Sequence, residues 1–304
     1  MKILLAEHSG FCFGVRRAVQ MALSAKEHDG DVCTLGELIH NPQVVDELAQ
    51  MGIGVCENAG NIQGKTVVIR SHGISKNELE TLISSGNKII DATCPYVKRA
   101  QELVASHGQE NILIMGDPEH PEVRGMLSYG GELTRVIPPL GDLPQENWKK
   151  LYIISQTTQK LSNLQDLVCR ALPDVLELTV FNTICSATSL RQGSALALAK
   201  ISDLMFVIGG RKSSNTRMLQ QLCSAQTDSV HIESEWDIAP HMLKGVQNIG
   251  LAAGASTPAG VIVKVFNKIK EIKGEAGTAR KIEDIPLFKE ESCRNMMKTK
   301  PQPA

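Results

Sequence analysis

The chain has 304 residues, and its 32 Lys and Arg side chains almost balance its 33 Asp and Glu side chains. This balance and the lack of a basic block argue against nucleic acid as a partner, and no segment reaches the roughly 18 apolar residues that cross a bilayer. We therefore expect a soluble cytoplasmic protein with no membrane partner, whose eight cysteines are metal-binding, catalytic or buried rather than disulfide-bonded.

Short apolar runs alternate with helical patterns through the first 270 residues. The alternation predicts an α/β fold with buried, largely parallel strands. Three segments share one layout, in which an apolar strand leads to a turn with one cysteine and then to a helix. These segments are residues 3–6 leading to Cys12, 88–91 leading to Cys94, and 178–181 leading to Cys185.

Each of the three segments continues with two more strands that are followed by polar residues. The second strands are predicted at residues 34–39, 112–115 and 204–208, and the third strands precede the polar runs 70–73, 155–158 and 254–257. In parallel α/β sheets, ligands bind beyond the carboxyl ends of the strands, where helix N-termini point. If the three modules pack around an axis, their cysteines and polar residues can converge on one cavity.

Cys12, Cys94 and Cys185 differ from the other cysteines because each lies at a predicted helix N-terminus, which favours thiolate. We expect the remaining five, at positions 33, 56, 169, 223 and 293, to be small buried apolar residues. The absence of a C-x-x-C pair disfavours a zinc ribbon or a thioredoxin-type redox couple. Three thiolates from separate modules suit an iron–sulfur cluster with one iron that lacks a protein ligand, and such an iron can activate an oxygen atom.

His40, His72 and His120 are each predicted to end an apolar strand, and each is followed by Pro, Gly or Asn-Pro near a helix start. Singly, each is best explained as a capping or core histidine, and the Ser-Ser-Asn run at 213–215 and Ser256 as ordinary N-cap residues. Taken together they are typical of an anion pocket built from helix N-termini. The common nucleotide-binding motifs are missing.

Glu122 is predicted at a strand end beside Pro121. A surface carboxylate is the ordinary interpretation, and a proton donor is the alternative. In a dry anionic pocket its pKa would rise and keep it protonated near neutral pH.

The order of these motifs resembles that of the 4-hydroxy-3-methylbut-2-enyl diphosphate reductases, the LytB/IspH family, over residues 1 to 270. The matching segments are Gly-Phe-Cys-Phe-Gly-Val at 10–15, Ile-His-Asn-Pro at 39–42, Ser-His-Gly at 71–73, Asp-Ala-Thr-Cys-Pro at 91–95, Glu-His-Pro-Glu-Val at 119–123, Ser-Gln-Thr-Thr at 155–158, Thr-Ile-Cys-Ser-Ala-Thr at 183–188, Ser-Ser-Asn at 213–215 and Ala-Gly-Ala-Ser-Thr-Pro at 253–258.

The resemblance implies a trefoil of three pseudo-threefold-related α/β modules around a central 4Fe-4S cluster, with Cys12, Cys94 and Cys185 as ligands and one open iron. It implies that Thr157 and Glu122 lie beside the substrate hydroxyl, with Glu122 supplying protons. It further implies a substrate-binding set made of His40, His72, His120, Thr157, Thr188, Ser213, Ser214, Asn215 and Ser256.

The implied reaction removes the hydroxyl group of an allylic diphosphate in the last step of the non-mevalonate pathway. Two electrons, from ferredoxin or flavodoxin, would give isopentenyl or dimethylallyl diphosphate. A non-redox dehydratase that uses the cluster only as a Lewis acid, and an iron–sulfur sensor that binds nucleic acid, are the alternatives. Dependence on an electron donor and salt-dependent nucleic-acid binding would distinguish them.

We expect the first module at residues 13–93 with Cys12 at its edge, and the second at 94–181. The third would combine 182–270 with 1–12. The charged tail at 271–304 is expected to be partly disordered and to lie outside the catalytic core.

Overall fold

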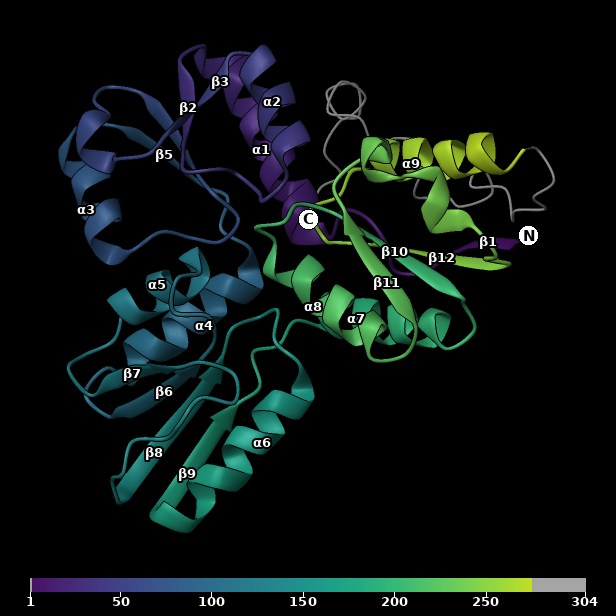
Figure 1. Cartoon of the computed structure of the whole chain (residues 1–304). Coiled ribbons are helices and arrows are strands. Elements are labelled where there is room, and N and C mark those ends of the chain that lie inside the picture. Colours follow the sequence, from purple (N-terminus) through teal and green to yellow (C-terminus); the bar gives the residue numbers. More distant parts are fainter. Residues whose placement is uncertain (1, 275–304) are drawn as a thin grey trace. The chain divides into compact units, whose positions relative to one another are not determined.

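The computed structural model describes residues 2–274, and its strands form three separate four-stranded sheets (Figure 1). Every strand pair in these sheets is parallel. The prediction of an α/β fold with three modules is thus confirmed. Within the described residues, no helix is both long enough and apolar enough to cross a membrane.

The first sheet has the strand order β1-β12-β10-β11 and is covered by helices on both faces. Its elements are β1 (Lys2–Leu5), β10 (Leu204–Ile208), β11 (Asp228–Ile232), β12 (Asn248–Ala253), α7 (Ser186–Ala199), α8 (Ser214–Ser224) and α9 (Ala259–Lys273), with the short turns η3 (Glu235–Asp237) and η4 (Pro240–Leu243). Successive side chains of a strand point to opposite faces. Phe206 therefore packs with Ile262 of α9, whereas Met205 and Val207 pack with Leu219 of α8.

The second sheet has the order β3-β2-β4-β5. Its elements are β2 (Val32–Leu35), β3 (Ile53–Cys56), β4 (Thr66–Ile69), β5 (Lys88–Asp91), the turn η1 (Ala59–Asn61) and α3 (Lys76–Ser84). Leu82 of α3 and Ile62 pack with Val67 and Ile69 of the central strand β4. α3 begins at a capping box in which Ser75 and Glu78 bond each other's backbone amides, so two otherwise unpaired donors are satisfied.

The third sheet has the order β7-β6-β8-β9 and carries the loops that matter most below. Its elements are β6 (Asn111–Met115), β7 (Thr134–Ile137), β8 (Trp148–Ser155), β9 (Val175–Phe181), α4 (Pro95–Ser106), α5 (Pro121–Ser128), α6 (Leu161–Ala171) and η2 (Leu172–Asp174). Ile112 and Ile114 face α4 and α5, and Leu113 and Met115 face α6. Burying each such side chain stabilises the folded state by about 1.5–3 kcal/mol. The apolar strands β6 and β8 accordingly lie at the centre of the sheet.

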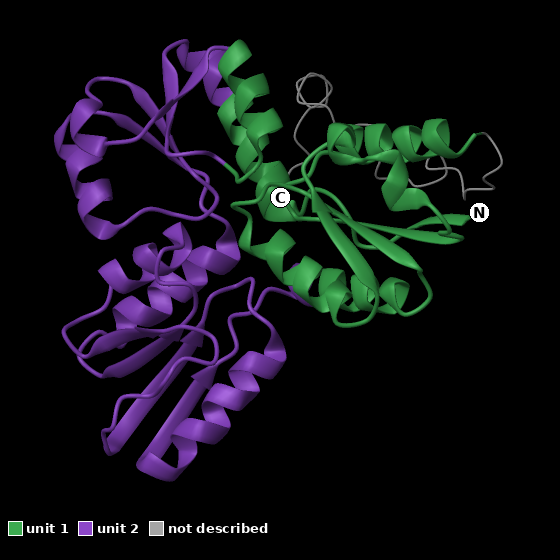
Figure 2. Ribbon diagram, viewed as in Figure 1, with its two compact units in different colours: residues 1–23, 39–51, 190–304 green, residues 24–38, 52–189 purple. Residues whose placement is uncertain are grey.

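The chain divides into two compact units (Figure 2). One comprises residues 1–23, 39–51 and 190–304, with the first sheet, α2 (Pro42–Gln50) and most of α1 (Phe13–Asp29); the other comprises residues 24–38 and 52–189, with the second and third sheets. The module boundaries expected from the sequence remain a prediction. Residues 275–304 of the expected tail lie outside the described residues.

The structure corrects the sequence prediction at two positions. The strand predicted at 34–39 ends at Leu35, because Gly36 adopts a left-handed conformation (φ 68°) and its N–H donates to the Cys56 carbonyl. Glu122 lies in the first turn of α5 rather than at a strand end. The histidines likewise follow their strands by several residues, in the loops that lead to the helices.

Gly250 and Gly54 offer a matched test of how tightly the sheets are covered. A Cβ at Gly250 in β12 would fall on the Met205 sulfur and lie 2.6 Å from the Ser202 hydroxyl, whereas a Cβ at Gly54 in the edge strand β3 would meet nothing within 4 Å. Gly250→Ala should therefore lower the free energy of unfolding by about 1–3 kcal/mol through overpacking. Gly54→Ala should change it little; equal effects of the two substitutions in denaturant titrations would contradict the packing described.

Candidate active site

The loops after β6 and β8 bring Glu122 and Thr157 together at the carboxyl edge of the third sheet. The Thr157 N–H donates to Glu122 Oε1 at 2.6 Å, and the Thr157 hydroxyl lies 3.0 Å from Glu122 Oε2. Glu122 is 1% exposed and Thr157 is 5% exposed. Because β6 and β8 are neighbours in the sheet, residues that follow their ends meet although 35 positions separate them in the chain.

Burial raises the pKa of Glu122 from 4.5 to about 7, and the two hydrogen bonds from Thr157 act in the opposite direction. A charged carboxylate loses its hydration when it is buried, and desolvation is the larger effect here. The rise in pKa expected for a carboxyl in a dry pocket is confirmed. Glu122 is consequently able to hold a proton near neutral pH and to release it there.

His120 is held as a neutral imidazole beside Glu122. As N-cap of α5, its Nδ1 accepts the Glu122 N–H at 3.2 Å, so the ring proton is assigned to Nε2. The rings of His72 and His120 meet edge to face, with centroids 5.6 Å apart. The loop after β4, which carries His72, and the loop after β6, which carries His120, therefore present imidazoles at one place.

Cys94 and Cys185 lie at the starts of α4 and α7 in the same unit. The Cys94 N–H donates to the Ser71 carbonyl at 3.0 Å, next to His72, and the Cys185 N–H donates to the Thr157 carbonyl at 3.1 Å. The Cys185 sulfur also accepts the Thr188 N–H at 3.3 Å and lies 3.1 Å from the Thr188 hydroxyl.

A side-chain hydrogen bond connects the two helices that begin after these cysteines. The Tyr96 hydroxyl lies 3.1 Å from the Ser186 hydroxyl. Together with the backbone hydrogen bonds of the two cysteines, this contact places both thiols in the neighbourhood of the Glu122–Thr157 pair.

In the other unit, the start of α8 meets the loops around residues 40 and 256. Ser213 caps α8 by accepting the Thr216 N–H at 3.3 Å, and the Ser256 hydroxyl donates to the His40 carbonyl at 3.1 Å. A Cβ at Gly210 would lie 2.5 Å from that same carbonyl, so only glycine lets the loop before α8 approach so closely.

Asn215 has a buried side chain with no protein partner in the described part of the chain. It is 4% exposed, and neither its Oδ1 nor its Nδ2 has a hydrogen-bond partner there. A buried amide left unbonded costs about 1–3 kcal/mol, so such groups are usually satisfied by water or ligand. The position of Asn215 in the first turn of α8, at the positive end of the helix, suits an anionic ligand.

Cys12 lies just before α1, and its N–H donates to the Ala255 carbonyl at 3.1 Å, one residue before Ser256. Its sulfur accepts the Val15 N–H at 3.4 Å, which repeats the contact between Cys185 and Thr188 in the other unit. Each of these two sulfurs thus accepts an N–H from the first turn of the helix that follows it.

The three thiols fit an iron–sulfur cluster by their chemistry. Cys12, Cys94 and Cys185 form no disulfide and are partly exposed, which suits sulfur ligands. No three His, Cys, Asp or Glu side chains of the described residues are grouped as ligands of a single metal ion. Cysteines at the starts of separate helices are chemically compatible with a cluster as the alternative.

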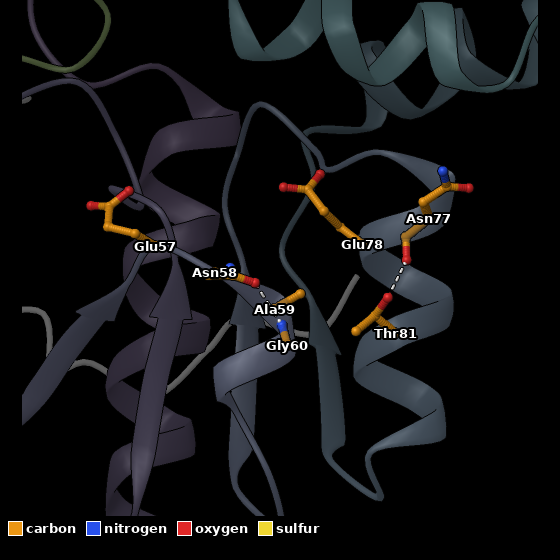
Figure 3. A pocket seen from close by; sticks show the side chains of 7 residues that line it. All are labelled: Glu57, Asn58, Ala59, Gly60, Asn77, Glu78 and Thr81. Carbon is orange, nitrogen blue, oxygen red and sulfur yellow. Dashed lines mark hydrogen bonds between the residues drawn. The ribbon is translucent and has the colours of Figure 1, made fainter.

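A surface cavity of about 380 Å³ lies between η1 and the start of α3 (Figure 3). Its lining residues are Glu57, Asn58, Ala59, Gly60, Asn77, Glu78 and Thr81. The Glu78 carboxylate is already bonded to the Ser75 backbone and hydroxyl. None of the side chains predicted to act on a ligand lines this cavity.

The remaining cysteines show which thiols are ordinary core residues. Cys33 and Cys223 are buried, and burial raises their pKa to about 12 and about 11, so they stay protonated. Cys56 is partly exposed, and Cys169, expected to be buried, is exposed. The sequence places Cys169 near the end of the amphipathic helix α6, where a one-residue rotation moves a side chain from core to solvent.

Gln156 and Gln159 were not predicted as site residues, although both are fully buried beside Thr157. Their signal in the sequence is a pair of glutamines that flanks Thr157 and Thr158 at a strand-to-helix turn. From the sequence alone, polar side chains at such a turn are predicted to be solvent-exposed, because the loop that covers them is not known.

These features define a buried carboxylic acid at the edge of a parallel sheet and a helix start with an unbonded buried amide, within a three-sheet α/β chain. The model of the LytB protein family matches residues 3–270, and the chain belongs to this family. It is 43% identical to the 4-hydroxy-3-methylbut-2-enyl diphosphate reductase of Geobacter metallireducens over 278 residues, covering 90% of this chain and 98% of that protein. It is 44% identical to the reductase of the same name from Geobacter sulfurreducens, over 89% of this chain and 98% of that protein.

Two solved structures are similar to the chain. One, described as (E)-4-hydroxy-3-methyl-but-2-enyl diphosphate reductase, the terminal enzyme of the non-mevalonate pathway, has a TM-score of 0.65 and 39% identity and covers 89% of this chain and 100% of its own. The reductase structure from Plasmodium falciparum has a TM-score of 0.82 over 98% and 97% of the two chains, and at 24% identity it supports the fold.

Glu122 should make the stability of the chain depend on pH. Its pKa is about 7 in the fold against 4.5 as the ordinary value, so the stability it contributes is complete below pH 4.5 and is lost as the pH rises to 7. Relative to Glu122→Gln, the wild type should lose on the order of 2–3 kcal/mol between pH 5 and pH 8. Urea unfolding measures the difference in free energy of unfolding between the two proteins. The same difference at both pH values would contradict the raised pKa of Glu122.

Asn215 should matter for ligand binding and not for folding. Asn215→Leu removes an unbonded buried amide at similar size, so the free energy of unfolding should stay within about 1 kcal/mol of the wild type or rise. Binding of inorganic diphosphate, measured by calorimetry, should weaken at least about tenfold. Unchanged diphosphate affinity in a folded Asn215→Leu protein would remove this residue from the anion site.

Proposed function

We propose that the chain catalyses reductive removal of the hydroxyl group of 4-hydroxy-3-methylbut-2-enyl diphosphate, giving isopentenyl diphosphate and dimethylallyl diphosphate. The observation that carries this proposal is the buried Glu122 carboxyl, which is bonded to Thr157 and has a pKa of about 7. Expelling an allylic hydroxyl as water requires an acid that still holds its proton at neutral pH. Membership of the LytB family supports the same reaction.

The reaction consumes two electrons and two protons for each substrate. The C–O bond breaks, and the oxygen leaves as water after it takes up one proton. The allylic fragment, reduced by two electrons, forms a new C–H bond with the second proton at either end of the allyl system, which gives the two products.

Glu122 and Thr157 supply the first proton in this proposal. When Glu122 is protonated at Oε2, it donates to the Thr157 hydroxyl, and the hydrogen of that hydroxyl becomes free to face the substrate oxygen. The 3.0 Å contact between the two oxygens suits such a transfer. The Thr157 N–H, 2.6 Å from Oε1, stabilises the carboxylate that remains after the proton has left.

The diphosphate would be bound by side chains at helix starts rather than by lysines or arginines. The proposed contacts come from His40, His72, His120, Ser213, Ser214, Asn215 and Ser256, and Thr188 would line the site. The neutral His120 can donate through Nε2, because Nδ1 accepts from the Glu122 backbone. The start of α8 adds the positive end of the helix dipole.

Cys12, Cys94 and Cys185 would hold a 4Fe-4S cluster with one iron open. When bound, the cluster supplies the electrons one at a time and a Lewis-acidic iron. Ferredoxin or flavodoxin would deliver the electrons, since the chain has no flavin or nicotinamide motif. The cytoplasm, where thiols stay reduced, suits this set of free cysteines.

Anaerobically prepared protein should convert the diphosphate alcohol to the two products only when a reductant such as dithionite-reduced methyl viologen is present. Cys94→Ser should lose the brown cluster absorption together with activity, because a hydroxyl is a poor iron ligand at neutral pH. Cys33→Ala, a change at a buried protonated thiol, serves as control and should retain both. Turnover without reductant, or a fully clustered and active Cys94→Ser protein, would contradict the proposal.

Glu122→Gln should retain the cluster absorption and diphosphate binding while turnover falls by about 10²- to 10⁴-fold, the usual contribution of a general acid. Product formation followed by phosphorus NMR measures the rate. Near-normal turnover would remove Glu122 from the proton path.

A further inference from the structure

Two buried glutamine side chains and one partly buried asparagine form a directional chain next to the Glu122–Thr157 pair. Asn163 Nδ2 donates to Gln159 Oε1 at 3.4 Å, and Gln159 Nε2 donates to Gln156 Oε1 at 3.1 Å. The same Gln156 oxygen accepts the backbone N–H of Asp117 at 3.1 Å. Gln156 is 0% exposed and Gln159 is 1% exposed, so water does not compete for these bonds.

The direction of the chain is fixed by the Asp117 backbone N–H, which can only donate, and the Gln159 amide adds a second donor. A primary amide has a donor end and an acceptor end of similar shape, and Gln156 could occupy its site either way round. Since two donors, Gln159 Nε2 and the Asp117 N–H, meet at the Gln156 oxygen, the reversed orientation would place a third donor against them. Gln159 thereby stabilises the orientation of Gln156 that bonds the neighbouring loop.

That neighbouring loop carries the proton donor. Its turn is closed by the His120 N–H, which donates to the Asp117 carbonyl at 3.0 Å, and Glu122 follows two residues later. A Cβ at Gly116 would lie 3.0 Å from both Cβ and Oε1 of Gln156, so this backbone rests directly on the Gln156 side chain.

The loop after β6 and the loop after β8 are thus joined at two positions. One is the bond from the Asp117 N–H to Gln156, and the other is the pair of bonds between Thr157 and Glu122. Because Gln156 and Thr157 are adjacent in the chain, a shift at the first junction moves the second.

We propose that Gln159 is a positioning residue for Glu122: through Gln156 it sets the distance and orientation of Glu122 relative to Thr157. Asn163 supports it from α6. The inference rests on the proposed function because Glu122 is taken as the proton source. The arrangement of Glu122 and Thr157 itself is a property of the folded chain and can be measured without turnover.

Gln159→Met tests the proposal, because methionine matches glutamine in length and makes none of its hydrogen bonds. In the holoprotein, kcat should fall about tenfold while KM stays within about twofold, since a displaced proton donor slows the reaction without changing diphosphate contacts. Asn163→Ala, which removes only the outermost bond, should lower kcat less and in the same direction. It also provides the test if Gln159→Met does not fold.

Asn87→Ala is the matched control in the same unit. The Asn87 side chain bonds the backbone of Lys65, Ile62 and Leu82 in the second sheet, so its loss should lower thermal stability and leave kcat unchanged. A Gln159→Met protein that loses stability like Asn87→Ala but keeps the wild-type kcat would overturn the proposal. A rise in KM at constant kcat would also overturn it, because Gln159 would then act on binding.

A second measurement does not depend on turnover. The Glu122 carboxyl stretch, isolated as the infrared difference between each protein and its Glu122→Gln derivative, reports the titration of this group. Because the bonds from Thr157 hold the pKa of Glu122 down, the midpoint should move upward in Gln159→Met and stay in place in Asn87→Ala. If the wild type fails to reduce the diphosphate alcohol, the proposed function is wrong, but an upward shift of the midpoint still supports the positioning role. An unchanged midpoint in Gln159→Met overturns that role.

Discussion

A carboxylic acid that is almost entirely removed from water and bonded to one threonine is the constraint on which the rest of this structure depends. Glu122 is 1% exposed, and its two oxygens meet the N–H and the hydroxyl of Thr157. The pairing requires that β6 and β8 be adjacent and parallel, so that the loops beyond their carboxyl ends lie side by side. It also requires that α5 begin next to Glu122, which His120 and Pro121 ensure at the N-cap and the first helical position.

Two opposing effects act on this carboxyl, and their magnitudes decide its state. The start of α5 favours a negative charge by about 0.3–1 kcal/mol, up to about 2 kcal/mol in partly buried geometries. The rise of the pKa of Glu122 from 4.5 to about 7 corresponds to on the order of 3 kcal/mol in favour of the neutral acid. Desolvation therefore outweighs the helix dipole, and the same helix start that would bind a phosphate leaves its own glutamate protonated. The first turn of α8, in the other unit, contains no acidic residue, and the buried Asn215 amide there is left unbonded.

The elements that periodicity governs were predictable from the sequence. The strand at 204–208 and the helices after Cys94 and Cys185 are found where the apolar pattern and Pro95 placed them. The strand predicted at 34–39 was too long, because a left-handed glycine is not distinguished by hydropathy. The raised pKa of Glu122 could be predicted only on the assumption of a dry pocket. The proximity of Glu122 to Thr157 depends on the order of the strands in the sheet, which the apolar pattern of the sequence does not reveal.

The buried amides of Gln156 and Gln159 escaped prediction for the same reason. A glutamine in a turn reads as exposed until the adjacent loop is known to cover it. The cysteine ligands and the diphosphate contacts stay predictions that rest on motif order, helix starts and thiol availability.

The pH dependence of kcat in the wild type and in Glu122→Gln tests the central claim, that Glu122 supplies the proton for hydroxyl loss, most directly. With a reductant that does not titrate in this range, wild-type kcat should fall on the alkaline side of about pH 7 as the carboxyl loses its proton. The residual rate of Glu122→Gln should be flat across the same range. An alkaline decline of the same midpoint in both proteins would assign the acid to another group and contradict the account.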